Sequence, residues 1–399
     1  MPMHRMTADD PWMGQTDTPA DPLVAGLRAV HRAVAELRRG TPVLLRDESH
    51  GVVMAAAETV GAGGLAEIAA LARVAPLLLL APSRAAAIAP LIPPALRPAG
   101  EEPAAVALRL PPALLEPAAL RSYADPTFES LLPPGQRPDR APAPPLAPAA
   151  LALAKLARLL PAVVMAPLRE GLGSPDLLAV AAANVLAYPV DAATSLRRVA
   201  EAAVPLEDAA DARIIAFRAA DGGIEHLAIV IGRPEELAAS GGAPLVRLHS
   251  ECFTGDLLGS LRCDCGPQLR RAIARIAQEE GGGVLLYLAQ EGRGIGLVNK
   301  LRAYRLQDAG LDTLDANRAL GWGADERNFL VAATMLEQLG IGRVRVMTNN
   351  PDKLAGLAAC GVVVEGRVAH EIAPNGVNDG YLATKAARFG HLLAPQDGN

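Results

Sequence analysis

Residues 251–267 read ECFTGDLLGSLRCDCGP, and this stretch holds three of the four cysteines of the chain. Cys252, Cys263 and Cys265 fall within fourteen positions, and His249 is the one histidine nearby. Thiolates suit Zn²⁺, which takes four tetrahedral ligands, so three cysteines leave one position for water. Water on such a zinc has a pKa of roughly 7, which supplies hydroxide at neutral pH. The spacing indicates a catalytic zinc site; a redox pair or cysteines packed as small hydrophobic residues are the alternatives.

Downstream of the cysteines, residues 287–297 read YLAQEGRGIGL, an apolar strand-like run that enters a glycine-rich turn. Closely spaced glycines let backbone amides approach an oxyanion, and the start of the helix expected from about Asn299 favours negative charge. Arg293 stands among these glycines, and its planar guanidinium can grip a phosphate. The turn is therefore a candidate phosphate site, although many strand-to-helix turns are glycine-rich without binding a ligand.

A second turn of this kind, TNNPDK at residues 348–353, also follows a strand-like run. Thr348 and Lys353 are candidates to reach a ligand there. A capped helix start explains Asn350 and Pro351 equally well. The fourth cysteine, Cys360, stands alone in an apolar stretch and is interpreted as a core residue.

The bulk properties limit the class of protein. A chain of 399 residues is long for one compact domain, so two domains are expected. The net charge of −5 and the aromatic content of 3% argue against a partner nucleic acid, which needs a basic surplus or stacking platforms. A small phosphorylated substrate is still allowed, because it needs only a local cluster of Arg and Lys.

The sequence predicts a cytoplasmic protein with reduced thiols. Four cysteines in a chain this long make no disulfide framework. The first residues lack the apolar core of a signal peptide. The most apolar run, residues 75–82, is far too short to cross a bilayer, so no membrane contact is expected.

The amino-acid composition of the chain changes near residue 190. Residues 1–20 are interpreted as a tail, residues 21–190 as an alanine-, leucine- and proline-rich domain, and residues 191–399 as an ordinary α/β domain. A proline-rich run from Pro133 to Pro148 is expected to form an exposed loop or linker. Strands are expected at residues 227–231, 284–288, 344–347 and 362–364, and helices at 265–280 and 328–339.

Four blocks in the second half carry a family resemblance. They are VRLHSECFTGDLLGSLRCDCGPQL (246–269), QEGRGIGLVNKLRAYRLQDAGLDTLDAN (290–317), LGWGADERNF (320–329) and TNNPDK (348–353). In order and separation they resemble GTP cyclohydrolase II over about residues 197–393. The resemblance implies a two-domain α/β protein whose C-terminal domain has a mixed sheet with helices.

The resemblance also implies roles for single residues. Cys252, Cys263 and Cys265 would hold one Zn²⁺ per chain, Asp325 would be a proton acceptor, Arg327 a proposed nucleophile, and Tyr304 a tyrosine near the base. The residues that would contact GTP are Arg247, Leu248, His249, Ser250, Glu251, Gln268, Glu291, Gly292, Arg293, Thr313, Thr348 and Lys353. The family needs Mg²⁺ with the substrate phosphates, forms homodimers, and yields formate, pyrophosphate and 2,5-diamino-6-(5-phosphoribosylamino)pyrimidin-4-one at the first committed step of riboflavin synthesis.

Elementary chemistry agrees with most of these roles. Opening the imidazole ring requires water at C8, cleavage of two C–N bonds and loss of formate, and Tyr304 could pass a proton to a leaving nitrogen. Glu251, Gln268 and Glu291 are candidates to read the donor edge of guanine. A guanidinium stays protonated in proteins, so charge stabilisation by Arg327 is favoured over covalent attack.

The first half resembles 3,4-dihydroxy-2-butanone 4-phosphate synthase more faintly, through RAVAELRRGTPVLLRDESHGVVMAAAE and LALAKLARLLPAVVMAPL. That synthase holds Mg²⁺ with an acidic loop, which is missing after Asp47, Glu48 and His50. These three residues are interpreted as a polar turn between strands, and residues 21–190 as a degenerate, non-catalytic domain. A fragment starting near Asp191 is therefore expected to keep activity.

Two other functions remain open from the sequence. One is a GTP-binding regulator that kept the fold but lost turnover, against which Cys252, Tyr304, Asp325 and Arg327 all argue. The other is a bifunctional enzyme with an active synthase domain, which the missing acidic loop opposes.

Overall fold

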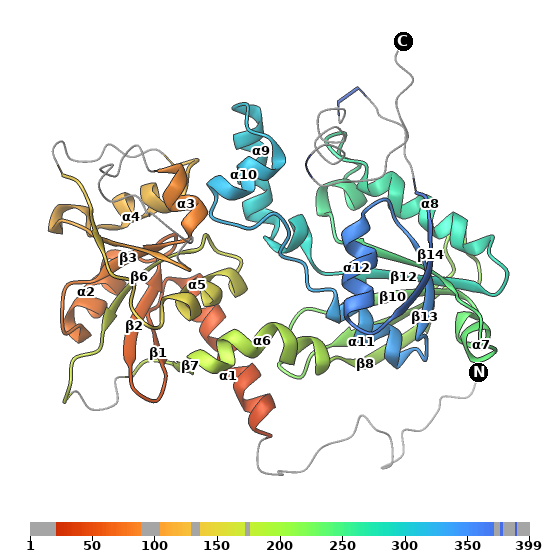
Figure 1. Ribbon diagram of the computed structural model, residues 1–399, viewed down its shortest axis with the longest axis horizontal. Helices are drawn as coiled ribbons and strands as arrows, with labels where there is room; N and C mark the ends of the chain where they lie inside the picture. Colours follow the sequence, from red (N-terminus) through yellow and green to blue (C-terminus); the bar gives the residue numbers. More distant parts are fainter. Residues whose placement is uncertain are drawn as a thin grey trace.

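The computed structural model describes residues 21–88, 104–128, 136–171, 176–370, 376–377 and 388. Two seven-stranded sheets, each covered by helices, lie at opposite ends of an elongated molecule (Figure 1). This arrangement confirms the expected two α/β domains. Among the described residues, no helix is long and apolar enough to cross a bilayer.

The N-terminal sheet has the strand order β5-β4-β3-β6-β2-β1-β7. Its pairings are antiparallel except that between β1 and β7. The strands are β1 Val43–Arg46, β2 Gly51–Ala56, β3 Leu77–Leu80, β4 Val106–Arg109, β5 Asp139–Ala141, β6 Ala162–Pro167 and β7 Ala179–Ala181. Most positions of β2, β3 and β6 are buried because helices cover both faces of the sheet.

The first helix follows local capping signals. In α1 (Pro22–Arg39), the Asp21 side chain accepts a hydrogen bond from the Leu23 amide, and Gly40 ends the helix at φ 80°. Glycine is needed there because a left-handed residue closes the last turn. The other helices of this domain are α2 Ala62–Leu71, α3 Pro82–Ala87, η3 Pro112–Leu114, α4 Pro117–Ala124 and α5 Ala147–Leu156.

The polar turn expected at residues 47–50 is confirmed. It connects β1 to its antiparallel neighbour β2. One Asp47 carboxylate oxygen accepts hydrogen bonds from the backbone amides of Ser49 and His50, at 2.7 and 2.6 Å. These two backbone bonds lower the pKa of Asp47, ahead of the contact with the His50 ring. The turn residues are therefore engaged with one another.

The proline-rich run from Pro133 to Pro148 differs in part from the expected loop. Residues 139–141 form β5, which pairs antiparallel with β4 at the edge of the sheet, and α5 begins at Ala147. Proline is tolerated at a sheet edge and in the first turn of a helix, because neither position needs its missing amide. The beginning of the run, to residue 135, lies outside the described residues.

The C-terminal sheet is mixed, with the strand order β14-β13-β11-β12-β10-β9-β8. Strand β11 runs parallel to β12 and β13, and β13 runs parallel to β14, whereas the pairs from β12 to β8 are antiparallel. The strands are β8 Arg197–Ala203, β9 Arg213–Arg218, β10 His226–Gly232, β11 Leu245–Ser250, β12 Gly282–Leu288, β13 Arg343–Met347 and β14 Val363–Val368. The four strands expected here are confirmed, with ends shifted by one or more residues.

The helices of the second half include both that were expected, over shorter ranges, as α8 and α11. The full set is α6 Ala182–Thr194, α7 Pro234–Ala239, η4 Phe253–Leu257, α8 Cys265–Ala277, η5 Glu291–Gly294, α9 Leu297–Asp308, α10 Thr313–Ala319, α11 Leu330–Gln338 and α12 Pro351–Ala359. Helix α6 runs through residue 190 and joins the two sheets. Cys360 is partly buried against the core at the end of α12, as expected.

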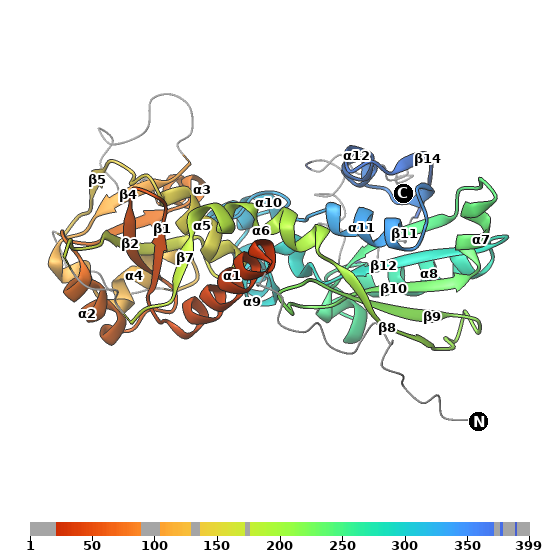
Figure 2. The same ribbon diagram turned by 90° about the horizontal axis from the view of Figure 1, so that it is seen from below.

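One hydrophobic core belongs to both halves of the chain. Ile295, Leu306, Leu320 and Trp322 are buried in the same cluster as Leu120 and other side chains of the N-terminal domain. Figures 1 and 2 show α9 and α10 between the two sheets, against the N-terminal domain. A fragment starting near Asp191 would expose this shared core to water and is therefore expected to be less soluble than the full chain.

Candidate active site

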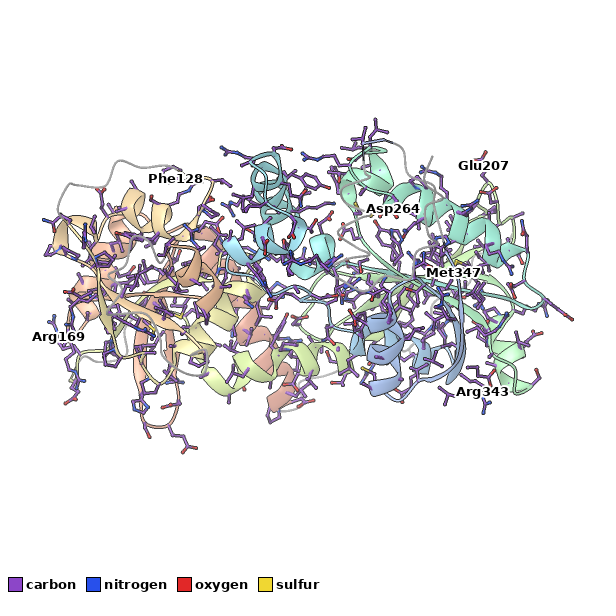
Figure 3. All side chains as sticks on the ribbon, turned by 45° about the horizontal axis from the view of Figure 1, so that its top comes forward. Phe128, Arg169, Glu207, Asp264, Arg343 and Met347 are labelled. Carbon is purple, nitrogen blue, oxygen red and sulfur yellow. The ribbon has the colours of Figure 1, made fainter. Side chains whose placement is uncertain are left out.

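The candidate site lies where three parallel strands end. Strands β11, β12 and β13 finish at Ser250, Leu288 and Met347, so their carboxyl ends share one edge of the sheet. The cysteine stretch, the glycine-rich turn and the TNNPDK turn follow these three ends. Parallel strands gather the loops at their carboxyl ends, which is where α/β proteins bind ligands. Asp264 at the start of α8 and Met347 at the end of β13 are labelled in Figure 3 and locate this part of the C-terminal domain.

The three predicted metal ligands come together. The sulfur atoms of Cys252, Cys263 and Cys265 lie within 4.8 Å of one another, with 3.7 Å between those of Cys252 and Cys263. Cys252 ends the segment after β11, and Cys265 begins α8. The turn η4 folds the chain between them, so the cysteines meet although they are eleven to thirteen positions apart.

The thiol cluster fits a zinc ion in its donor chemistry and its shape. Three sulfur donors are the soft set that Zn²⁺ accepts. Gly255 lies against this cluster, and a Cβ added there would come within 2.8 Å of the Cys263 sulfur and 2.9 Å of the Cys252 sulfur. The backbone of η4 therefore lies so close to the sulfur atoms that only glycine fits at position 255 without a shift of its neighbours.

Replacement of Gly255 by alanine is expected to abolish metal binding although all three cysteines remain. The added Cβ would push two sulfur atoms apart, and their geometry limits the affinity of the site. Metal analysis of purified Gly255→Ala checks this. Gly342→Ala is the matched control, because a Cβ there meets nothing within 4 Å. A normal metal content in Gly255→Ala would contradict the cluster as a metal site.

The pKa values of the three thiols are shifted by their contacts with one another and with Lys300. Hydrogen bonds from the Cys263 and Cys265 thiols, followed by the Lys300 ammonium, hold the pKa of Cys252 far below its usual value. The bond to Cys252 correspondingly raises the pKa of Cys263 and of Cys265. The lowered pKa favours the thiolate form of Cys252, and thiolates are the form that ligates metal.

Lys300 links the thiol cluster to the glycine-rich turn. Its ammonium lies 3.0 Å from the Cys252 sulfur, 3.1 Å from the Thr254 hydroxyl and 2.9 Å from a carboxylate oxygen of Glu291. The other oxygen of Glu291 accepts a hydrogen bond from the Phe253 amide at 2.7 Å. Glu291 therefore uses both oxygens to hold the two loops together. Glu251 lines the same cleft, and its carboxylate has no hydrogen-bond partner within the described ranges.

Tyr304 lies on the cleft side of α9, one turn after Lys300. Burial raises the pKa of Tyr304 to about 12, while the neighbouring Lys300 ammonium acts in the opposite direction. The guanidinium of Arg262 covers the Tyr304 ring at 4.5 Å from its centroid. The phenol is therefore protonated at neutral pH, and its ring is held by stacking as well as by the helix.

Arg247 and Gln268 also line the cleft. Arg247 is buried and donates to the Met347 carbonyl at 2.9 Å and to the Gln268 side-chain oxygen at 2.6 Å. Gln268 in turn donates to Asp264 at 2.6 Å. Its backbone carbonyl lies 2.9 Å from Nε2 of His370, and burial lowers the pKa of His370 to about 4. Arg247 thus fixes Gln268, and its own Nε is buried with no hydrogen-bond partner in the described part of the chain.

His249 stabilises the cysteine loop through its contact with Asp256. Its Nε2 lies 3.0 Å from both carboxylate oxygens of Asp256, and its ring stacks on that of Tyr287 at 5.5 Å. Asp256 also accepts hydrogen bonds from the Tyr287 hydroxyl and the Cys252 amide, each at 3.0 Å. Burial lowers the pKa of His249. This network holds the first cysteine in place.

Asp325 and Arg327 form a close ion pair at the rim. Nε of Arg327 donates to the two Asp325 oxygens at 2.8 and 3.0 Å, and the guanidinium lies over the Phe329 ring at 5.4 Å. The pKa of Asp325 is lowered by these hydrogen bonds and the Arg327 charge, which together outweigh burial. Arg327 lines the cleft, whereas Asp325 is not among its lining residues.

The glycine-rich turn and the TNNPDK turn contribute backbone groups and cationic side chains to the cleft. In the glycine-rich turn, Gly292 and Arg293 both have φ 63°, and left-handed backbone at a non-glycine residue costs energy that functional sites often store. At the end of β13, the Thr348 hydroxyl accepts from the Asn350 amide at 3.0 Å. Nζ of Lys353 donates to the Leu248 carbonyl at 2.7 Å. The capped helix start expected at Asn350 is confirmed, since its side chain accepts from the Asp352 amide.

The structure brings nearly all the predicted residues into one cleft. Those that line it are Arg247, His249, Ser250, Glu251, Cys252, Cys263, Cys265, Gln268, Glu291, Gly292, Arg293, Tyr304, Thr313, Arg327, Thr348 and Lys353. Leu248 is buried behind the cleft, where its carbonyl oxygen holds Lys353.

Sequence reasoning missed several lining residues, namely Asp264, Lys300, Gln307, Asn317, Asn349 and His370. A signal was present for Lys300, which stands four positions before Tyr304 and therefore shares its helix face. No local pattern pointed to His370, which reaches the cleft only through the pairing of β13 with β14.

Comparisons with known proteins agree with this geometry. The profile of the GTP cyclohydrolase II family matches residues 197–369. A GTP cyclohydrolase-2 of Azospirillum brasilense is 50% identical over 383 residues, which cover 92% of this chain and 95% of that protein. One from Azotobacter vinelandii is 55% identical over 172 residues, or 43% of this chain and 80% of that protein. The Azospirillum protein thus aligns with both halves of the chain.

Solved structures give a weaker likeness. A two-domain 3,4-dihydroxy-2-butanone 4-phosphate synthase from A. baumannii is 20% identical, covers 85% of this chain and 99% of that one, and has a TM-score of 0.32. The same synthase from Candida albicans is 19% identical, covers 40% of this chain and 96% of that one, and has a TM-score of 0.31. Scores this low carry no argument about function.

Proposed function

Since this chain belongs to the GTP cyclohydrolase II family and is a hydrolase of GTP in riboflavin biosynthesis, we propose that a zinc ion on its three cysteines takes part in opening the imidazole ring. The products would be formate, pyrophosphate and 2,5-diamino-6-(5-phosphoribosylamino)pyrimidin-4-one. The observation that carries this proposal is the cleft in which the thiol cluster, a protonated tyrosine and several cations face one another. The experiment that tests it is release of C8 of GTP as formate.

Cys252, Cys263 and Cys265 would hold the zinc, which supplies Lewis-acid activation of water for attack on C8. Ring opening then breaks the C8–N9 bond, and a second hydrolysis breaks the C8–N7 bond and frees formate. Each departing nitrogen needs a proton. Tyr304 is buried in the cleft with its hydroxyl protonated, so it would supply this proton as a general acid. Lys300 would keep Tyr304 beside the thiolates by bonding to Cys252.

Recognition of guanine requires acceptors for its N1–H and its exocyclic amine. Glu251 fits this role, because its carboxylate lines the cleft and has no hydrogen-bond partner among the described residues. Glu291 fits it less well, because both of its oxygens already accept hydrogens from Phe253, Gly292 and Lys300. A carboxylate left unpaired when guanine is absent discriminates strongly against other bases.

The triphosphate would lie toward the glycine-rich turn and the rim, with Mg²⁺ bound to its oxygens. Arg293 and Arg327 line this part of the cleft. Arg327 is held by Asp325 and remains a cation, so it would stabilise negative charge at the α-phosphate while pyrophosphate leaves. Asp325 would orient Arg327, in place of the proton-accepting role that the family resemblance suggests.

The Arg327→Lys substitution is expected to distinguish charge stabilisation by Arg327 from covalent attack by its guanidinium. Arg327→Lys keeps the charge and should lose only about tenfold in pyrophosphate release, whereas Arg327→Gln should lose on the order of 10²–10³-fold. Covalent attack by the guanidinium would instead make both variants equally inactive. Initial rates of pyrophosphate release from GTP distinguish the two patterns.

We also propose that residues 21–190 are non-catalytic. Asp47 is engaged with Ser49 and His50, and the cysteine trio is the one metal-binding cluster among the described residues. Without a carboxylate cluster a divalent cation is poorly held. Ribulose 5-phosphate, incubated with full-length protein and excess Mg²⁺, should therefore stay unchanged. Its conversion would favour the bifunctional alternative.

We further propose that the protein forms a homodimer and is located in the cytoplasm. Leu257, Leu258 and Leu261 of the cysteine loop and Leu301 of α9 are exposed, and Lys300 of α9 contacts Thr254 of the same loop. Exposed apolar patches of this kind mark protein–protein contacts. Sedimentation velocity of the full-length protein tests this, and a monomer would contradict the dimer.

A further inference from the structure

Arg302 connects α9 to the N-terminal domain. It lies between Lys300 and Tyr304 in sequence, and each of these is about 200° away around the helix, so Arg302 points from the opposite face. Its guanidinium uses all three nitrogens: Nη2 donates to Glu58 at 2.8 Å, Nε contacts Asp125 at 2.9 Å, and Nη1 donates to the Asn299 side chain at 2.8 Å. The side chains of Arg302, Glu58 and Asp125 are only 10%, 10% and 2% exposed.

Both carboxylates are fixed within their own domain. The second oxygen of Glu58 accepts from the Leu160 amide at 2.8 Å. Oδ1 of Asp125 accepts from the backbone amide and the hydroxyl of Thr127, at 2.8 and 2.6 Å. A buried guanidinium between two fixed carboxylates has one favourable position, so these bonds determine where this side of α9 lies.

Arg158 makes a second connection to the same wall of the cleft. It has φ 56°, an unusual backbone for a residue with a side chain. In that conformation its carbonyl accepts from the Asn299 side chain at 3.0 Å, and its guanidinium donates to the Ala289 carbonyl at 2.8 Å. Ala289 directly precedes the glycine-rich turn, and Gly296 packs so closely that a Cβ would come within 3.0 Å of the Arg158 side chain.

Apolar packing reinforces these polar contacts. Ala303 and Leu306 of α9 and Leu320 after α10 share a core with the N-terminal domain. Arg84 of α3 also donates to the Ala319 carbonyl at 3.3 Å. Figures 1 and 2 place α10 beside α3, with α9 also lying between the two sheets. The helix that carries Lys300 and Tyr304 is thus built on the N-terminal domain.

We propose that the N-terminal domain is a mount for α9, and that Arg302, through Glu58 and Asp125, is a positioning residue that sets Lys300 and Tyr304 against the thiol cluster. This inference rests on the proposed function of the cleft. It gives the domain a present role that needs no chemistry of its own. A misplacement of about 1 Å costs on the order of 10²-fold in rate, so the mount would act on turnover more than on substrate binding.

The test uses the full-length Glu58→Gln/Asp125→Asn variant, whose changes are isosteric and lie outside the cleft. We expect kcat for formate release to fall about 10²-fold, with KM within about threefold and the zinc content unchanged. A readout independent of turnover is hydrogen exchange of the α9 amides, which should become faster in this variant while those of α8 stay unchanged. Glu201→Gln, which breaks an ion pair with Arg213 on the far edge of the C-terminal sheet, is the control and should match the wild type.

A double-mutant cycle assigns the effect to Arg302. In an Arg302→Met background, Glu58→Gln and Asp125→Asn should cause little further loss, because the connection is already broken. If the double carboxylate variant does not fold, the single variants provide the same comparison. Wild-type kcat and wild-type exchange in α9 of the folded variants would overturn the mount. A wild-type protein that releases no formate would instead refute the proposed function, and the exchange measurement would still test the mount.

Discussion

Cys263→Ser is expected to lose its zinc and to release no measurable formate from GTP. Serine is a hard, neutral ligand that replaces one of three sulfur donors within 4.8 Å of one another, so the metal loses a third of its protein ligands. The fold should persist, because the surrounding residues belong to a strand, a helix and the His249–Asp256 network, all of which form without the cysteine side chain.

Elemental analysis and a formate assay on the same preparation check this result. Cys360→Ser is the matched control, since Cys360 lies at the end of α12 and takes no part in the thiol cluster. It should bind one zinc per chain and turn over at the wild-type rate. One zinc per chain in Cys263→Ser would refute the assignment of the ligands.

Tyr304→Phe should bind GTP normally and turn over 10²–10⁴-fold more slowly, which is roughly the effect of losing a general acid. The change removes only the hydroxyl, whose pKa is raised to about 12 by burial and which is therefore a proton donor at neutral pH. The ring should stay in place, because it remains on α9 under the Arg262 guanidinium.

Single-turnover kinetics and equilibrium binding of GTP separate the two effects. Tyr123→Phe is the control, because Tyr123 is a buried tyrosine of α4 in the N-terminal domain. It should leave kcat unchanged. Full kcat in Tyr304→Phe would reduce Tyr304 to a packing residue and leave the proton for the departing nitrogen without a source.

Much of the candidate site could be predicted from the sequence because its parts are local. Cys252, Cys263 and Cys265 are close in the chain, and the two turns each follow a recognisable strand. Parallel strands β11, β12 and β13 then bring these segments to one edge. Spacing therefore predicted the thiol cluster, Arg293 and Lys353, whereas Arg247 and Arg327 followed from the family resemblance.

The remainder depends on contacts between distant residues. Glu58 and Arg302 are 244 positions apart, and neither stands in a pattern that reveals the other. The shared core around Trp322 could not be predicted from the sequence either, because an apolar helix face does not indicate which domain it packs against. Likewise, the proline-rich run that contains β5 gave no sign that these residues would pair with β4 at the edge of the sheet.

The most direct test of the account is the fate of C8 when purified full-length protein is incubated with GTP labelled with ¹³C at that position, in the presence of Zn²⁺ and Mg²⁺. We expect ¹³C NMR to find one labelled formate for each GTP consumed, accompanied by one pyrophosphate. Consumption of GTP with the label still in the purine ring would contradict imidazole opening. GTP that binds and stays intact would identify the protein as a regulator that has kept the cleft without its chemistry.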